Sequence, residues 1–201
     1  HLAKSNIRKY KIILEPYKKN TAPAILSCAL LKEVSSKQPL IFFPSDHLIE
    51  KTRQFNNAIN LNKKFLNDKN IFIFGIKPSS PSSQYGYFLT KKTLNGLNRV
   101  IKFIEKPILS KAKQIIKKKA YWNSGIIFAR KDSIINNFSA HQSKTLKLCT
   151  NSVRKSKISK NVYYLYKKPF NQIKENSIDY AILEKANNIN AIKLNIPWSD
   201  L

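Results

Sequence analysis

The chain has 201 residues, 42% of them hydrophobic and 11% aromatic, and its 37 basic and 11 acidic residues give a net charge of +26. This apolar content excludes an intrinsically disordered chain, and a domain of this length can bury roughly 70% of its unfolded surface. The positive charge is mostly lysine and is scattered over predicted helices and loops, without an arginine-rich stripe or an aromatic ladder. We therefore expect no specific nucleic-acid partner.

No apolar run approaches the ~20 residues that a membrane-spanning helix needs, and no signal peptide opens the chain. Cys28 and Cys149 lie far apart without metal-ligand spacing, which favours reduced thiols. We expect a cytoplasmic protein without a membrane partner. Because the chain contains no methionine, we also expect it to be part of a longer protein, with a first strand that precedes His1.

The first predicted elements are a short strand at 10–14 and a helix that begins at Thr21 or Ala22, with Pro23 in its first turn. Exposed backbone N–H groups at such a start suit a phosphate or a base carbonyl, although ordinary capping explains the same residues.

The apolar run 39–43 ends at Pro44 and is followed by Asp46. Such a run is typical of a strand that is buried on both faces of a parallel sheet, and ligands of open α/β sheets collect beyond the carboxyl ends of the strands. Asp46 is therefore a candidate functional carboxylate, although an aspartate in this position also commonly begins a turn.

Helical spacing over 55–66 and a second buried strand at 71–76 follow. The alternation of strands and helices predicts a layered α/β sheet with crossover connections. Asn95-Gly96 then predicts a hairpin between 87–90 and 98–105.

Three short segments combine polar groups with aromatic or charged neighbours. Gly86 lies between two tyrosines. This pattern suggests either that the backbone lies close beneath a flat group or that the chain makes an ordinary turn. Glu105 and Lys106 end the hairpin and could bind a hydroxyl and a phosphate, or form a solvated strand end. Trp122 and Asn123 lie in the segment that leads into a predicted strand at 126–129. They could form an apolar floor with an amide above it, which would suit a sugar.

The remaining chain is predicted to hold helices at 110–119 and 177–185 and a strand at 190–194, with helical or irregular segments at 131–138 and 144–156. Asp200 is a second candidate carboxylate. Because repeats, low-complexity tracts and linkers are absent, we expect a single domain over 1–201.

Seven of these segments, in order, resemble the nucleotidyltransferase domain of bacterial mannose-1-phosphate guanylyltransferases. They are Glu15-Pro16 with Asn20-Thr21-Ala22-Pro23-Ala24, Pro44-Ser45-Asp46-His47, Tyr85-Gly86-Tyr87, Phe103-Ile104-Glu105-Lys106-Pro107, Trp122-Asn123-Ser124-Gly125, Ser177-Ile178-Asp179-Tyr180-Ala181 with Glu184-Lys185, and Trp198-Ser199-Asp200. The family's glycine-rich N-terminal signature would lie upstream of His1. Lys18-Lys19 replaces the family's Gly-Arg, which keeps the charge but loses bidentate phosphate geometry.

The resemblance implies an α/β, three-layer Rossmann-like nucleotide-diphospho-sugar transferase fold, with a mixed, mostly parallel sheet and helices on both faces. It implies transfer of GMP from GTP to mannose 1-phosphate, which gives GDP-mannose and pyrophosphate. The domain would be incomplete in this chain, and a homo-oligomer remains open.

By the same resemblance, Asp46 and Asp200 would hold Mg²⁺, and with Lys106 they would be the catalytic residues. Glu105 and Lys106 would bind the sugar hydroxyls and the sugar phosphate, and Asn123 the sugar. Asn20, Thr21 and Gly86 would face the nucleotide or the floor of its pocket, and His47 would shape the loop beside Asp46.

Three alternatives stay open. The first is a sister enzyme that uses another base or sugar, such as glucose 1-phosphate. The second is a truncated relative that binds ligand without catalysis, because the chain has no phosphate-cradling glycine-rich loop of its own. A nucleic-acid-binding protein is the weakest alternative.

Overall fold

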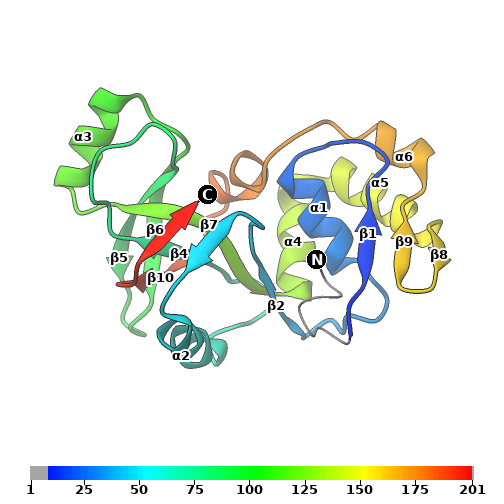
Figure 1. The fold of residues 1–201 in the computed structure, drawn as a ribbon, viewed down its shortest axis with the longest axis horizontal. Helices are drawn as coiled ribbons and strands as arrows, with labels where there is room; N and C mark the ends of the chain where they lie inside the picture. The colour runs from blue at the N-terminus through cyan, green and yellow to red at the C-terminus, as the bar shows by residue number, and fades with distance from the viewer. Residues whose placement is uncertain (1–8, 201) are drawn as a thin grey trace.

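The computed structural model describes residues 9–200. The helices are α1 (Thr21–Ala29), α2 (Thr52–Lys63), α3 (Leu109–Lys117), α4 (Lys131–His141), α5 (Ser143–Arg154), α6 (Lys167–Asn171) and the π-helix η2 (Asp179–Leu183). The strands are β1 (Ile12–Leu14), β2 (Pro39–Phe42), β3 (His47–Ile49), β4 (Ile71–Ile76), β5 (Tyr87–Lys92), β6 (Asn98–Ile104), β7 (Tyr121–Arg130), β8 (Lys157–Ser159), β9 (Val162–Tyr164), β10 (Ile189–Leu194) and β11 (Trp198–Asp200). Figure 1 shows their arrangement.

Six of the strands form one sheet in the order β2-β7-β4-β10-β6-β5, and a further pairing between β7 and β5 curls it toward a closed barrel. The α/β class is confirmed. The expectation of a mostly parallel sheet is wrong, since within residues 9–200 only the β4–β10 pair of this sheet is parallel and its other pairs are antiparallel. The reason is β7, a long strand that runs antiparallel to both β2 and β4.

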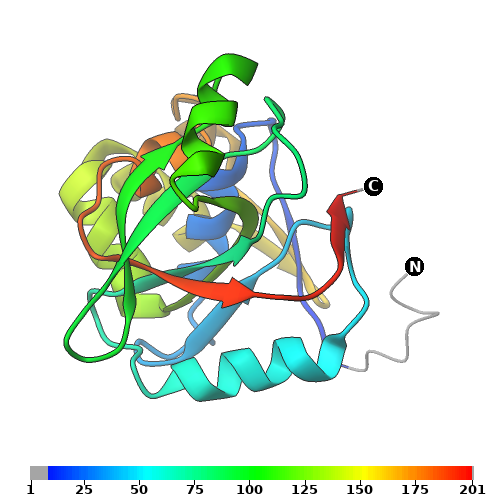
Figure 2. The ribbon, with the colours of Figure 1, turned by 90° about the vertical axis from the view of Figure 1, so that its left-hand side faces the viewer.

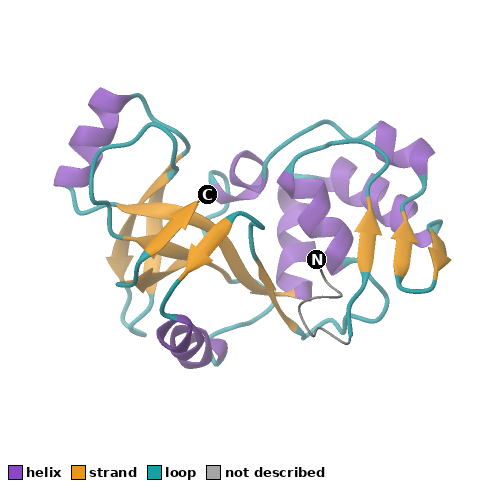
Figure 3. Ribbon diagram, viewed as in Figure 1, coloured by secondary structure: helices purple, strands orange, loops and turns teal. Residues whose placement is uncertain are grey.

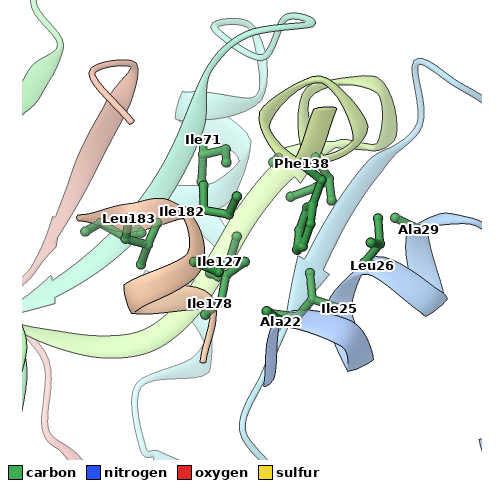
Figure 4. Packing of buried hydrophobic residues seen from close by; sticks show 14 of the residues in the cluster. Ala22, Ile25, Leu26, Ala29, Ile71, Ile127, Phe138, Ile178, Ile182 and Leu183 are labelled. Atoms are coloured by element: carbon green, nitrogen blue, oxygen red, sulfur yellow. The ribbon is translucent and has the colours of Figure 1, made fainter. Parts of the chain in front are cut away.

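Helices cover both faces of the sheet because successive residues of each central strand point to opposite sides. On β4, Ile71 and Ile73 join a core beneath α1 and α4, which also includes Phe138 (Figure 4). Phe72 and Phe74 join a second core on the other side, beneath α2 and α3. In Figure 2, α2 lies at the bottom of the view and α3 at the top, and residues of both helices belong to this second core. The layered arrangement predicted from the strand–helix alternation is therefore present.

Most helices gather at one end of the molecule, beside the small sheet β1-β9-β8 (Figure 3). Hydrogen bonds at the start of α1 join this end of the molecule to the segment that leads into η2. The Ala22 N–H donates to the Asn176 carbonyl at 3.2 Å, and the Asn176 N–H donates to the Lys19 carbonyl at 3.2 Å. The Ile178 N–H donates to Thr21 Oγ1 at 2.9 Å. These three bonds place the first turn of α1 directly beside the segment that leads into η2.

The strands β3 and β11 form a separate two-stranded antiparallel ribbon, which the sequence patterns did not indicate. Its register pairs Asp200 with His47 and Trp198 with Ile49. In Figure 2 the two strands lie side by side near the C-terminal end of the chain. The ribbon therefore brings the segment after β2 next to the last described residues.

None of the helices in residues 9–200 is both long and apolar enough to cross a membrane.

Candidate active site

A cleft runs between the curled sheet and the helical end of the molecule. It consists of two cavities of about 220 and about 590 Å³, and Glu105, Lys106 and Asp179 line both. The smaller cavity is also lined by Pro44, His47, Gln84, Tyr85, Gly86, Asn123, Ser124, Gly125, Trp198 and Asp200. The larger is also lined by Asn20, Thr21, Glu175, Asn176, Ser177 and Tyr180. Segments from almost the whole chain therefore meet in one depression.

The residues predicted from the sequence lie in or beside this cleft. Asp200, Lys106 and Gly86 line the smaller cavity together with Glu105 and Asn123. Asn20 and Thr21 line the larger one. Asp46 lines neither cavity, but it is exposed and immediately precedes His47, the ladder partner of Asp200. Of the two candidate metal ligands, Asp200 thus ends one strand of the ribbon and Asp46 immediately precedes the other.

Asp200 and Asp46 flank His47. The Tyr85 hydroxyl donates to Asp200 Oδ1 at 2.6 Å, and this bond is the main reason that the pKa of Tyr85 rises to about 12. His47 Nε2 lies 3.8 Å from Asp46 Oδ1. Burial lowers the pKa of His47, and the two aspartates oppose that shift.

His47 also accepts a hydrogen bond at Nδ1 from the indole Nε1 of Trp198, at 3.4 Å. An imidazole that accepts at Nδ1 carries its proton on Nε2, the atom that faces Asp46. His47 therefore holds the ribbon together, in agreement with the expected loop-shaping role.

Within residues 9–200, no three His, Cys, Asp or Glu side chains gather closely enough to form a metal site by themselves. A pair of carboxylates nevertheless matches the requirements of Mg²⁺, which is usually bound through one or two carboxylates and completes its shell with water and substrate phosphates. The donor set of Asp46 and Asp200 is therefore of the right chemical kind for a cation that arrives with a nucleotide.

The sugar-binding residues expected from the sequence are packed against one another. The Asn123 N–H donates to the Gly86 carbonyl at 2.8 Å. A Cβ atom added at Gly86 would lie 2.5 Å from Glu105 Oε2 and 3.5 Å from the Asn123 Cβ. Any larger residue here would displace the Glu105 carboxylate, which lies directly against the backbone. Gly86 thus forms the floor beneath Glu105.

The aromatic floor differs from the expectation. Trp122 is buried, with 8% of its surface exposed, and lines neither cavity. Its ring packs against Tyr85 at 4.8 Å between centroids, and Tyr85 packs against Trp198 at 5.4 Å. The aromatic surface of the smaller cavity therefore comes from Tyr85 and Trp198.

Asn20 and Thr21 organise the wall of the larger cavity. Asn20, not Thr21 or Ala22, is the N-cap of α1, and its side chain accepts from the Thr21 N–H at 2.8 Å. Its φ of 69° lies in a region that non-glycine residues rarely adopt, and such residues cluster at functional sites. Asn20 Nδ2 also donates to Glu175 Oε1 at 3.4 Å.

Asp179, the first residue of η2, is the cleft residue that sequence reasoning missed. Asn123 Nδ2 donates to Asp179 Oδ1 at 2.9 Å, although the two residues are 56 positions apart. An aspartate followed by an apolar stripe predicts an ordinary helix start, and only the fold brings it to Asn123. The available signal was a carboxylate within a segment that already resembled a family motif.

Burial raises the pKa values of two carboxylates that line both cavities, Glu105 and Asp179. Burial raises the pKa of Glu105 to about 7, with Asp179 and Glu184 adding to the shift and Lys106 opposing it. Burial also raises the pKa of Asp179. Glu184 Oε1 accepts the Glu105 N–H at 3.3 Å.

Replacing Glu105 with glutamine should therefore raise the melting temperature at about pH 8 but not at about pH 4. The pKa of Glu105 is about 7 in the folded protein, against an ordinary value of 4.5 for a glutamate. Between these values the folded chain keeps a proton that the unfolded chain has lost, so wild-type stability falls as pH rises and the penalty is complete above about pH 7. Thermal melts of both proteins across this range test the prediction. An equal difference in melting temperature at both ends would contradict it.

A layered α/β fold with a lysine, buried carboxylates and two further aspartates around one cleft suits the joining of two phosphate-bearing substrates. The chain belongs to the nucleotidyl transferase family, whose pattern it matches over residues 2–201. The resemblance predicted from the sequence motifs is thereby confirmed.

Among curated proteins, the chain is 33% identical over 199 residues to mannose-1-phosphate guanylyltransferase of Escherichia coli, covering 94% of this chain and 43% of the relative. It is 29% identical over 205 residues to the alginate biosynthesis protein AlgA of Pseudomonas aeruginosa, covering 100% of this chain and 43% of the relative. The chain thus spans less than half the length of either protein.

Two solved structures are similar to this fold. A crystal structure of mannose-6-phosphate isomerase from Helicobacter pylori superimposes with a TM-score of 0.87 at 30% identity, covering 99% of this chain and 78% of that one. A structure titled mannose-1-phosphate geranyltransferase, from Thermus thermophilus, superimposes with a TM-score of 0.80 at 23% identity. The match covers 93% of this chain and 53% of that one. The second likeness concerns the fold alone.

Proposed function

We propose that the chain acts as a mannose-1-phosphate guanylyltransferase, transferring GMP from GTP to mannose 1-phosphate with release of pyrophosphate. The observation that carries the proposal is the shared cleft. Lys106, Glu105, Asn123 and Asp200 line one cavity, and Asp46 immediately precedes His47, the ladder partner of Asp200. The names of similar curated proteins support the mannose branch.

The reaction requires that the two phosphate-bearing substrates are aligned and that their negative charge is neutralised. A phosphate oxygen of mannose 1-phosphate attacks the α-phosphorus of GTP, a new P–O bond forms, and the bond to the pyrophosphate leaving group breaks. Because the attacking phosphate is already an anion, the reaction needs no Ser, Cys or His nucleophile. Rate enhancement comes from holding two polyanions in line and from compensating the charge that develops between them.

Each residue has a role in this scheme. The Lys106 ammonium neutralises the sugar phosphate. Glu105 and the Asn123 amide bind sugar hydroxyls, and Gly86 leaves room for the Glu105 carboxylate against the backbone. Asn20 and Thr21 hold the start of α1, whose backbone faces the nucleotide. We infer that the reaction takes place in the cytoplasm.

Asp46 and Asp200 would hold Mg²⁺, which when bound compensates negative charge on the nucleotide phosphates. Tyr85 donates to one oxygen of Asp200 and so fixes the direction of that carboxylate. His47, in contact with both the ribbon and Asp46, keeps the two acidic side chains on the same edge of the cleft.

A pyrophosphate-release assay on an intact protein that contains this chain tests the proposal. The expected result is Mg²⁺-dependent release with GTP and mannose 1-phosphate, exceeding that with UTP or dTTP and with glucose 1-phosphate. Lys106→Ala should remove the activity, whereas Lys111→Ala, an exposed lysine of α3 outside the cleft, should retain it. A clear preference for glucose 1-phosphate would identify a sister enzyme. Binding of both ligands without turnover would favour the non-catalytic alternative.

A further inference from the structure

Asp179 occupies the centre of the cleft. It lines both cavities, a property shared only with Glu105 and Lys106 among the lining residues named above. Its backbone carbonyl accepts from the Glu184 N–H at 2.9 Å, five residues on, which is the hydrogen bond of a π-turn. Single π-turns occur frequently at functional sites. The turn presents Asp179 at the junction of the two cavities.

The orientation of the Asn123 amide depends on Asp179. Asn123 Nδ2 donates to Asp179 Oδ1 at 2.9 Å, and Asn123 Oδ1 accepts from the Gly125 N–H at 3.2 Å. An ionised carboxylate only accepts hydrogen bonds, so the nitrogen of the amide must face Asp179. Asn123 is 9% exposed, and a flipped amide would place two acceptors against each other. Asp179 and Gly125 therefore fix which polar atoms Asn123 offers to a ligand.

The same carboxylate influences the charged groups around it. Asp179 lies near Glu105 and Lys106, which directly follow β6, and near Glu184, which directly follows η2. Lys106 has a φ of 41°, which is unusual for a residue other than glycine and directs the chain sharply after Glu105. The electrostatic environment of the proposed sugar-phosphate end thus includes a negative group that does not itself belong to the hairpin.

We propose that Asp179 is a positioning residue for the sugar-phosphate end of the cleft, acting by orienting the Asn123 amide. This inference rests on the proposed function. On this inference, replacing Asp179 weakens the recognition of mannose 1-phosphate and leaves the recognition of GTP unchanged. The hydrogen bonds that position the Asn20 side chain and the Asp200 carboxylate do not involve Asp179, so we expect nucleotide binding to change little when Asp179 is replaced.

Calorimetric titration measures each ligand separately, without turnover. Asp179→Ala should weaken binding of mannose 1-phosphate about tenfold, the loss expected for one hydrogen bond to a charged group, while Mg²⁺–GTP binding changes less than about twofold. Asp179→Asn, which has the same shape and keeps an acceptor oxygen, should give a smaller loss in the same direction. It also protects the test against a failure of the alanine variant to fold.

A double-mutant cycle separates positioning from general structure. In an Asn123→Ala background, Asp179→Ala should weaken mannose 1-phosphate binding by less than about twofold, because the amide through which Asp179 acts has gone. Asp132→Asn is the matched control. Asp132 pairs with Arg130 and caps the first turn of α4, outside the cleft, so this change should lower the melting temperature and leave both affinities unchanged.

Equal losses for Asp179→Ala with and without Asn123 would overturn the inference, as would equal weakening of both ligands. If the unmodified chain binds neither ligand, the proposed function fails, and the role of Asp179 falls with it. If the unmodified chain binds both and the Asp179 variants bind mannose 1-phosphate normally, only the further inference fails.

Discussion

Asp46→Asn is expected to abolish Mg²⁺-dependent turnover without unfolding the protein. Asparagine preserves the size of the side chain but removes the charge that a divalent cation needs. Losing one group that compensates charge in the transition state typically lowers kcat by about 10²–10³-fold. The Asp46 side chain is 63% exposed, and its ion contact with His47 is long, at 3.8 Å. The fold should therefore tolerate the change.

Steady-state rates over a range of Mg²⁺ concentrations, with melting curves alongside, provide the measurement. Asp68→Asn is the matched control, because Asp68 is also an exposed aspartate but lies outside both cavities. The control should retain the wild-type rate and metal dependence. A wild-type rate in Asp46→Asn would remove Asp46 from the metal site.

Gly86→Ala should raise the KM for mannose 1-phosphate at least about tenfold, since a displacement of about 1 Å in a substrate-holding group can cost up to about 10²-fold. The new Cβ would lie 2.5 Å from Glu105 Oε2, closer than real contacts allow. The Glu105 carboxylate is the end of a flexible side chain, so it can move aside without disrupting the core. The expected outcome is a folded protein with a displaced Glu105 and a nearly unchanged KM for GTP.

Gly96→Ala provides the comparison for this variant. Gly96 lies in the exposed β5–β6 turn with φ of 79°, and a Cβ there would meet nothing within 4 Å. The change strains the turn but cannot reach the cleft, so it should slightly lower the melting temperature without altering either KM. An unchanged mannose 1-phosphate KM in Gly86→Ala would show that Glu105 does not bind the sugar hydroxyls.

Local patterns predicted most elements because each depends on neighbouring residues. The apolar run 71–76 became β4, and the Asn95-Gly96 signal became the β5–β6 hairpin. Strand direction was not predictable in the same way. A strand covered on both faces has the same composition whether its neighbours run parallel or antiparallel, so the run before Pro44 did not indicate that β2 pairs antiparallel with β7.

The site residues show the same difference between local and long-range signals. Asp46, Glu105 and Lys106 end strands or follow them, where the sequence itself marks a candidate position. The ribbon β3–β11 and the contact of Asp179 with Asn123 join residues far apart in the chain. The strands of this ribbon, with the sequences His-Leu-Ile and Trp-Ser-Asp, contain no apolar run that would mark them as strands. The π-turn of η2 has no sequence signature distinct from that of an ordinary helix, and 177–185 was therefore predicted as one.

The ribbon also determines when the cleft can exist. Trp198 contacts His47 across 151 positions of sequence, and closing so long a loop is entropically costly until much of the fold is in place. A nascent chain that has emerged from the ribosome through β10 already contains the strands of the curled sheet and the helices that cover it. It would lack the Asp200 edge of the cleft. The protein should therefore become able to bind its substrates only after β11 has emerged and joined β3.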